Sequence, residues 1–196
     1  MAPLEIRPGL WRWTAPHPDW KPAPAGSSGD WAREVGCALY ETAAHAVFFD
    51  PLADDDDAAF WEWAQERCAG RTVAVALTIR FHSRSRESFV SRLRASDEPP
   101  AEVEVIAFPV LDETMFWLAE HGALIPGDRL LGDGDGGLTL CPQSWLRYIE
   151  PEPTREQMRE ALGVLRGLDV SLVLTSHGEP VLTGAREALA WALEDA

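Results

Sequence analysis

The sequence is short of positive charge. Lysine and arginine together number 17, against 32 aspartates and glutamates, and the formal net charge is -15. Neutralising the phosphates of a nucleic acid or the headgroups of an anionic membrane requires a basic surface. The charge balance therefore argues against both as the main partner, and we expect a small-molecule ligand instead.

Cysteine and long apolar runs are also scarce. Cys37, Cys68 and Cys141 are widely spaced, odd in number and form no Cys-x-x-Cys pair. This excludes a disulfide framework and a cysteine-rich metal site, and fits a reducing compartment. No apolar run has the length of a signal peptide or of a membrane-spanning helix. We therefore expect a soluble, cytoplasmic protein.

The sequence does contain enough apolar material for a core. Of its 196 residues, 46% are hydrophobic and nine are tryptophan, which excludes wholesale disorder. The length fits a single domain spanning 1–196. Strand patterns come first, in "GLWRWTAP", "VGCALYET" and "HAVFFDPL", and strands then alternate with helices. This order predicts a layered α/β domain.

Several local signals place the elements. The acidic run 54–57 favours a helix start, and Thr154 with Gln157 three residues later has the spacing of a capping box. The run "RTVAVALT" is continuously apolar, as expected of a strand buried on both faces. Segment 114–137 reads as two strands joined by a turn at 120–122, followed by a glycine-rich loop. "VSLVLTSHGEPVL" reads as the last strand and its exit loop.

Three predicted strands end in polar residues suited to chemistry. His82 follows "VAVALT", Asp128 lies in "ALIPGDRLLG" and His177 in "LVLTSHGEPV". Strand ends of this kind place side chains on one rim of a sheet, the usual location of a site in α/β folds. Two imidazoles and a carboxylate suit zinc or iron, provided that the fold brings them together. Each of the three residues also has a purely structural interpretation, as a turn residue or as a histidine at the rim of the sheet.

The segments "HAVFFDPL", "ALIPGDRLLG" and "LVLTSHGEPV" resemble, in order and spacing, landmark segments of the metallo-β-lactamase-fold hydrolases. They look most like the branch near the hydroxyacylglutathione hydrolases. The resemblance implies an α/β fold, an αββα sandwich of two mixed sheets with helices outside. It also implies that Asp128 matches the aspartate bridging two metals and His177 the last histidine ligand. Asp50 matches an aspartate that gives the site structural support.

The metal-binding motif departs from the family pattern. The family has Thr-His-x-His-x-Asp-His after a buried strand, and here Thr78 is followed by "IRFHSR". The aligned ligand positions hold Ile79, Phe81, Ser83 and Arg84. None of these binds zinc, His82 falls one place off, and Pro109 stands where the family has its middle histidine. The resemblance therefore implies a degenerate metal site that cannot assemble a dinuclear hydrolytic centre.

Three hypotheses follow from these residues. The first is a noncatalytic or strongly diverged protein without a cofactor, a pseudoenzyme that binds a small anionic ligand. Its ligand-binding residues would be Arg80, Arg84 and Arg86, because arginines hold carboxylates or phosphates without a metal. These arginines also fit a solvated helix face.

The second hypothesis is a hydrolase of esters or thioesters. It would use one zinc, iron or manganese ion held by His82, Asp128 and His177. The third is a structural or regulatory partner protein, which only the tryptophan content favours. In the family the loop after the first strands overhangs the site, so part of the tryptophan-rich entry, which consists of Trp11, Trp13, Trp20 and Trp31, is expected to line a pocket. No residue is assigned a catalytic role from the sequence.

Overall fold

The computed structural model describes residues 2–194. Its first half forms a five-stranded sheet in the order β1-β2-β3-β4-β5. The strands are β1 (Leu4–Arg7), β2 (Leu10–Pro16), β3 (Glu34–Glu41), β4 (His45–Phe49) and β5 (Thr72–Ala76). Neighbours run antiparallel except β4 and β5, which are parallel, so the sheet is mixed.

The second half forms a four-stranded sheet in the order β11-β8-β7-β6. Its strands are β6 (Glu104–Phe108), β7 (Glu113–Leu118), β8 (Ala123–Ile125) and β11 (Leu172–Val173). This sheet is also mixed, because β11 and β8 are parallel and the other pairs are antiparallel. A separate antiparallel ribbon consists of β9 (Leu130–Gly132) and β10 (Leu138–Leu140).

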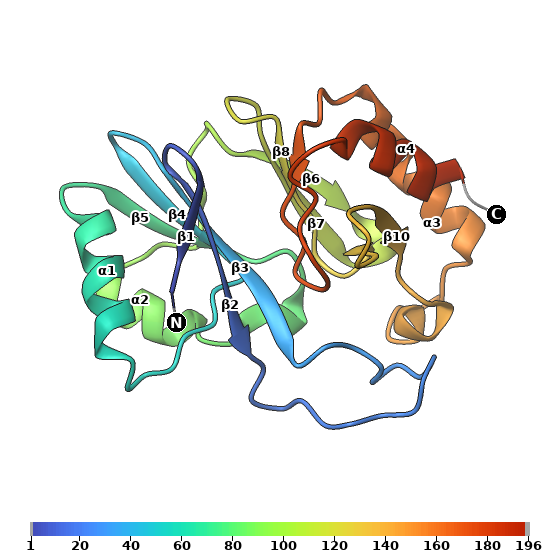
Figure 1. Ribbon diagram of the computed structural model, residues 1–196, viewed down its shortest axis with the longest axis horizontal. Coiled ribbons are helices and arrows are strands. Elements are labelled where there is room, and N and C mark those ends of the chain that lie inside the picture. The colour runs from blue at the N-terminus through green and yellow to red at the C-terminus, as the bar shows by residue number, and fades with distance from the viewer. Residues whose placement is uncertain (1, 195–196) are drawn as a thin grey trace.

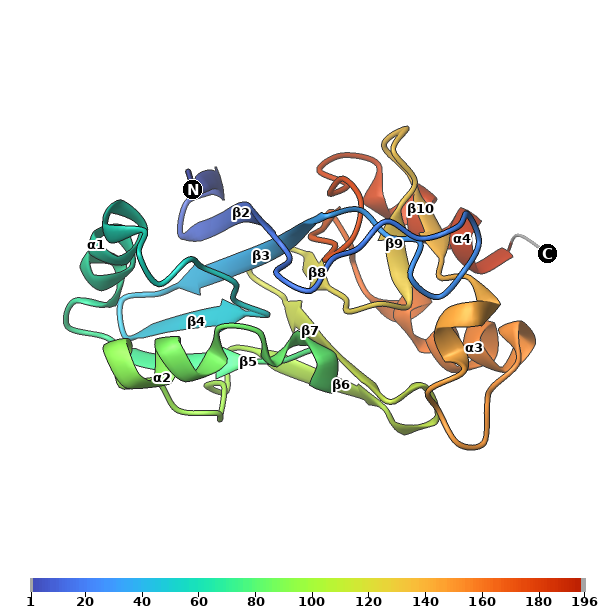
Figure 2. The same cartoon turned by 90° about the horizontal axis from the view of Figure 1, so that it is seen from below.

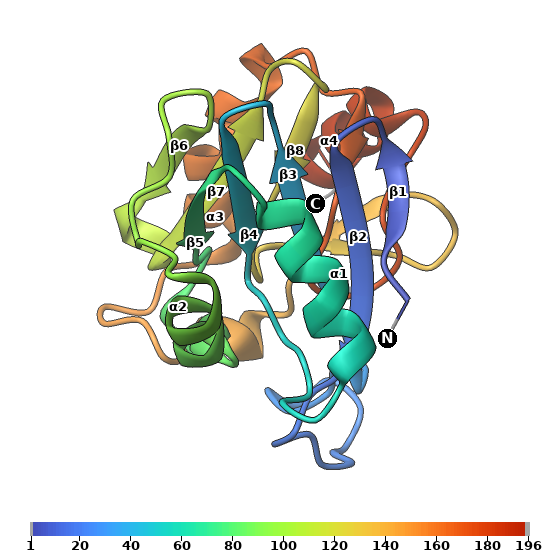
Figure 3. The ribbon, with the colours of Figure 1, turned by 90° about the vertical axis from the view of Figure 1, so that its left-hand side faces the viewer.

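The helices lie on the outer sides of the two sheets (Figure 1). Helices α1 (Ala58–Cys68) and α2 (Arg86–Leu93) cover the first sheet, as Figure 3 shows from that side. Helices α3 (Arg155–Leu162) and α4 (Ala185–Glu194) lie at the opposite end of the molecule, against the second sheet. The architecture is thus the αββα sandwich of two mixed sheets that the sequence resemblance predicts.

Three apolar layers hold the sandwich together. Along β4, Ala46 and Phe48 face the layer shared with α1 and α2, while Val47 and Phe49 face the second sheet. The rings of Phe49 and Phe116 lie 5.2 Å apart between the sheets. A third layer joins the second sheet to α3 and α4. Fully burying a valine or phenylalanine side chain contributes about 1.5–3 kcal/mol. Because β4 buries apolar side chains on both of its faces, it stabilises two layers at once.

The helix signals act as the sequence predicts. Asp57 caps α1 by accepting a hydrogen bond from the Phe60 amide at 3.0 Å. Thr154 and Gln157 form the reciprocal capping box of α3, with hydrogen bonds of 2.8 and 3.2 Å. Each cap satisfies amides that have no partner within the helix.

Three details differ from the sequence expectations. The predicted glycine-rich loop is the turn of the β9–β10 hairpin, in which the Asp133 carboxylate accepts the amides of Asp135 and Gly137. Helix α3 ends at Leu162, and the apolar pattern up to Leu168 continues as a 3-10 segment, η4 (Gly163–Gly167). The last strand, β11, has only two residues because the chain leaves the sheet before His177.

The loop between β2 and β3, residues 17–33, extends away from the first sheet toward the second half of the chain (Figure 2). There the Gly26 carbonyl accepts a hydrogen bond from the Ser144 hydroxyl at 3.2 Å. This segment carries Trp20 and Trp31 of the tryptophan-rich entry, whose first two members, Trp11 and Trp13, lie in β2. Across residues 2–194, no helix combines the length and the apolar content that crossing a membrane requires.

Candidate metal centre

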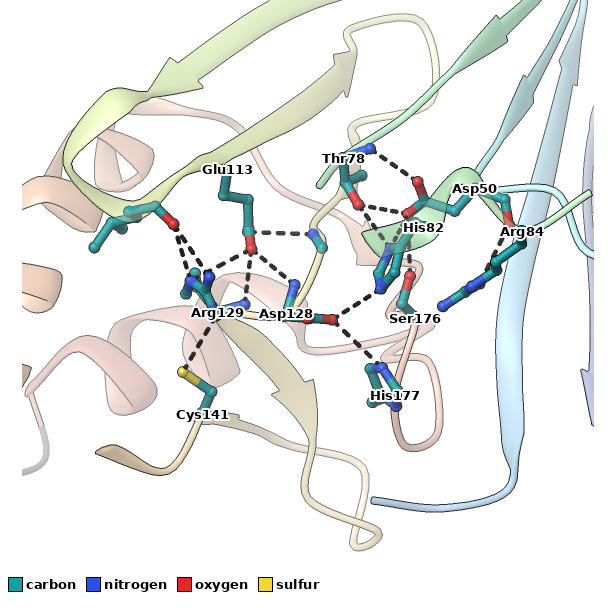
Figure 4. Close-up of polar contacts among 12 residues, drawn as sticks. Asp50, Thr78, His82, Arg84, Glu113, Asp128, Arg129, Cys141, Ser176 and His177 are labelled. Atoms are coloured by element: carbon teal, nitrogen blue, oxygen red, sulfur yellow. Dashed lines mark hydrogen bonds and ion pairs between the residues drawn. The ribbon is translucent and has the colours of Figure 1, made fainter. Parts of the chain in front are cut away.

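His82, Asp128 and His177 come from three separate segments and meet at one rim of the sandwich (Figure 4). His82 lies in the 3-10 segment η1 (Arg80–Ser83) after β5, Asp128 between β8 and β9, and His177 after β11. One ligand atom of each lies within 4.8 Å of the other two. Oδ1 of Asp128 is 3.0 Å from Nε2 of His82 and 3.4 Å from Nε2 of His177. The fold therefore brings the three predicted ligands together.

A short turn gives His82 its place in this cluster. The His82 amide donates to the Ile79 carbonyl at 2.9 Å, which closes a 3-10 turn directly after the buried strand. The turn carries the imidazole inward, and only 3% of the residue is exposed. Although His82 lies one place off the aligned motif, this turn brings it into the cluster.

Asp50 contacts the His82 imidazole at Nδ1, the ring nitrogen that does not face Asp128. Its backbone adopts a φ of 45° at the end of β4, in the left-handed region where Asp is better tolerated than most residues. Oδ2 of Asp50 lies 2.9 Å from Nδ1 of His82 and accepts hydrogen bonds from the hydroxyls of Thr78 at 2.5 Å and Ser176 at 3.2 Å. Oδ1 accepts the Thr78 amide at 2.8 Å. Asp50 therefore fixes His82 and ties it to the segment that carries His177.

A second buried carboxylate positions Asp128. Glu113, at the start of β7, accepts the amides of Gly127, Asp128 and Arg129 at 3.2, 2.8 and 3.1 Å. Arg129 in turn donates two hydrogen bonds to the Leu111 carbonyl, at 3.2 and 3.1 Å. Burial raises the pKa of Glu113 to about 7, against the opposing effect of the Arg129 guanidinium. No motif marks Glu113 in the sequence, because its partners are backbone amides.

The charges of the three ligands are coupled. Burial opposes the charged form of His82, but the carboxylates of Asp50 and Asp128 outweigh burial and raise the pKa of His82 to about 9. Burial also opposes ionisation of Asp128, yet the two imidazoles hold the pKa of its carboxyl well below the usual value. Burial lowers the pKa of His177 and outweighs the carboxylate of Asp128. The cluster therefore combines the ionised carboxylate of Asp128 with two different imidazoles: the neutral form is favoured for His177 and the cationic form for His82.

The donor set fits a metal ion. Two imidazole nitrogens and one carboxylate oxygen suit zinc, iron or manganese. Asp50 fixes the proton of His82 on Nδ1, which leaves Nε2 as the ligand atom. Oδ1 of Asp128 is buried and, among residues 2–194, has no hydrogen-bond partner of ordinary geometry, although two imidazole nitrogens lie nearby. A cation shared by all three would satisfy that oxygen.

A cavity of about 320 Å³ opens above these three residues. Four aromatic side chains, Trp31, Phe81, Trp145 and Tyr148, line it together with polar residues that include Asp19, Ser28 and Arg84. The rings of Trp31 and Trp145 lie 5.6 and 5.3 Å from the His177 ring. His17 also lines the cavity. Of the tryptophans expected to reach a pocket, Trp31 lines this cavity. Trp145 and Tyr148 stand in the irregular segment 141–150 without a strand-end pattern, which is why the sequence does not single them out.

The three predicted anion-binding arginines do not converge. Arg84 lines the cavity and donates to the Asp50 carbonyl at 3.2 Å. Arg80 instead forms an ion pair with Asp112 at 3.1 Å, and Arg86 pairs with Asp97. Because η1 turns tightly and α2 begins soon after it, the three side chains point in different directions. Two of them form ion pairs with acidic residues. The expected three-arginine site is therefore reduced to Arg84.

The chain resembles known proteins in fold rather than in sequence. No protein-family model and no curated protein matches the sequence. Solved structures do match the fold. VMB-1 aligns with a TM-score of 0.64 at 13% identity, over 98% of this chain and 94% of that one. The DIM-1 metallo-β-lactamase aligns with a TM-score of 0.59 at 14% identity, over 98% and 94%.

A third structure is the metallo-β-lactamase FIM-1 from Pseudomonas aeruginosa in its mono-zinc form. It aligns with a TM-score of 0.60 at 12% identity, over 98% of this chain and 93% of that one. The chain has the metallo-β-lactamase fold. Within this fold, His82, Asp128 and His177 form a group that can hold a metal ion.

Proposed function

We propose that this protein of metallo-β-lactamase fold is a hydrolase that uses one metal ion, held by His82, Asp128 and His177. The observation that carries the proposal is the convergence of the three ligand atoms within 4.8 Å at the base of a cavity. Three protein ligands leave a coordination position open, as is typical of catalytic rather than structural sites. Zinc, iron and manganese all accept this donor set.

The residues of the chain then have separate roles. Asp50 keeps Nδ1 of His82 protonated, so that Nε2 points to the ion. Glu113 fixes the backbone that presents Asp128. Arg84, the one predicted arginine that lines the cavity, would bind an anionic group of the substrate. The metal ion, when bound, supplies Lewis-acid activation of a carbonyl group and of water.

Esters and thioesters are the substrates that we propose. The segments around Asp128 and His177 resemble those of the hydroxyacylglutathione-hydrolase branch, and this resemblance is the reason to test thioesters first. The cavity volume of about 320 Å³ is at the small end of the usual range for small-molecule sites. A compact substrate with one negative charge fits these features.

A specific observation favours a second function, metal-free binding of an anion. His82 lies between the carboxylates of Asp50 and Asp128, which raise its pKa to about 9. A protonated His82 would satisfy both carboxylates without a metal ion. Arg84 would then be the principal anchor for a small carboxylate or phosphate.

One experiment separates the two functions. The protein is purified without chelator, its metal content is measured, and zinc binding is followed by titration calorimetry. We expect near-stoichiometric binding that His177→Ala weakens by at least tenfold and that His45→Ala, on the surface beside Glu102, leaves unchanged. Hydrolysis of generic thioesters should follow the same pattern. A protein that takes up no zinc, iron or manganese would refute the hydrolase and leave the anion-binding function.

A further inference from the structure

Two aromatic side chains stand exposed at the mouth of the cavity. Phe81 is 49% exposed and Tyr148 is 58% exposed, and both line the cavity. Their ring centroids lie 5.5 Å apart at an interplanar angle of 61°. Phenylalanine is among the residues most often buried, so a paired arrangement at a cavity entrance calls for a reason beyond folding. Phe81 is also one of the positions at which the family motif has a metal ligand.

Arg80 holds this aromatic pair in place. Its guanidinium carbon lies 4.8 Å from the centre of the Phe81 ring, and its Nη2 donates to the Tyr148 carbonyl at 3.4 Å. Its Nη1 forms the ion pair with Asp112. One side chain thus links η1, the loop after η3 (Gln143–Leu146) and the loop before β7. Two rings that are fixed before a ligand arrives lose less entropy on binding than mobile ones do.

The shared cavity indicates what these rings contact. Phe81 and Tyr148 share the cavity with two further aromatic side chains, Trp31 and Trp145, and with the polar residues Arg84 and His177. A ligand that fills it meets both π-systems and polar groups. Aromatic rings pair favourably in edge-to-face and offset arrangements, beyond the gain from buried area alone. An aromatic ring on the ligand satisfies these walls better than a bare anion does.

We propose that Phe81 and Tyr148 form a subsite for an aromatic ring, and that the natural substrate is an aryl-substituted acid derivative. Its carboxyl-derived end lies at Arg84 and the three ligands, and its ring packs against the side of the Phe81–Tyr148 pair that lines the cavity. The chemistry assigned to the carboxyl-derived end rests on the proposed hydrolase function. The ring subsite itself needs no metal ion.

Binding of two carboxylates tests the subsite. Acetate and phenylacetate differ by one phenyl group, and their dissociation constants are measured by calorimetry on the full chain, with zinc added and with chelator. Under whichever of the two conditions the carboxylates bind, with zinc or with chelator, we expect phenylacetate to bind at least about tenfold more tightly than acetate. Phe81→Ala and Tyr148→Ala should each reduce this preference several-fold without changing zinc affinity. Phe81→Leu keeps the bulk, removes the ring and guards against an effect of misfolding.

The control is Trp191→Ala, which removes an aromatic side chain that is 68% exposed on α4, away from the cavity. It should leave both dissociation constants unchanged. Equal affinity for the two carboxylates, or no measurable binding of phenylacetate, would overturn the subsite. Zinc binding and thioester hydrolysis without a phenyl preference would refute the subsite alone. A phenyl preference in a chain that binds no metal would refute the hydrolase alone.

Discussion

Nδ1 of His82 lies 2.9 Å from Oδ2 of Asp50, although the two residues are 32 positions apart in the chain. The same oxygen accepts hydrogen bonds from Thr78 and Ser176. The carboxylate at the end of β4 therefore joins the end of β5, the η1 turn and the segment before His177. A change at Asp50 should affect both the orientation of the ligand and the stability of the rim.

Asp50→Asn tests this relationship. The amide keeps the shape but offers one acceptor oxygen in place of two, so contacts to Thr78 or His82 are lost. We expect zinc affinity to fall by about 10- to 100-fold and the free energy of unfolding by about 1–3 kcal/mol. Zinc calorimetry and urea unfolding measure the two effects. Asp135→Asn, exposed on the β9–β10 turn, removes the same charge and should change neither.

Part of this site was accessible from the sequence for physical reasons. Asp128 and His177 follow apolar strands abruptly, and a strand that stops at a polar residue places it on a sheet rim. The capping box of Thr154 and Gln157 also acts locally. Such features depend on neighbours in the chain, so a sequence pattern can reveal them.

Other features depend on contacts that no local pattern encodes. The inward turn of His82 is fixed by Asp50, far away in sequence. The directions of Arg80 and Arg86 are set by Asp112 and Asp97, which the sequence does not place beside them. The three-residue strands of the β9–β10 hairpin are too short to show a clear alternation. These outcomes required the assembled fold.

Glu113 offers a second prediction, because its carboxylate accepts hydrogen bonds from the amides of three successive residues. Glu113→Ala leaves the buried amides of residues 127–129 without this acceptor. We expect the free energy of unfolding to fall by about 3 kcal/mol or more, with weaker zinc binding because Asp128 is no longer held. Glu113→Gln keeps one acceptor oxygen and should cost about 1 kcal/mol.

Urea unfolding and zinc titration of the two variants provide the measurement. Glu104→Ala, at an exposed position in β6, is the matched control for loss of a glutamate. If the alanine and glutamine variants of Glu113 were equally stable, the backbone amides would not depend on this carboxylate.

Gly132 is predicted to be essential for the position of His177. Its amide donates to the His177 carbonyl at 3.0 Å, and an added Cβ would overlap the backbone of Glu179. Since backbone cannot swing aside as a side chain does, Gly132→Ala should displace the loop that carries His177. We expect a loss of about 1–3 kcal/mol in unfolding free energy together with weakened zinc binding.

The control for this change is Gly167→Ala, because an added Cβ there meets no heavy atom of residues 2–194 within 4 Å, apart from the adjoining backbone. That variant should unfold and bind zinc like the unchanged protein. Undiminished zinc affinity in Gly132→Ala would mean that the loop absorbs the methyl group without moving His177.

Tyr40 leads to a prediction about alkaline pH. Its hydroxyl donates to Glu120 at 2.9 Å, and burial, together with Glu120, raises the pKa of Tyr40 from 10.0 to about 12. The folded protein therefore holds the phenolic proton more tightly than the unfolded chain does. The resulting stabilisation is fully present below pH 10 and is lost as the pH rises toward 12.

Urea unfolding of the unchanged protein and of Tyr40→Phe, at steps from pH 8 to pH 11, isolates this contribution because every other group titrates in both. The stability difference between the two should be constant up to about pH 9 and then shrink with increasing pH. Glu120→Gln removes the neighbouring charge, so the pKa of Tyr40 is raised less. The stability difference should then decline less steeply with pH. A difference that stays constant to pH 11 would show that Tyr40 ionises alike in the folded and unfolded chains.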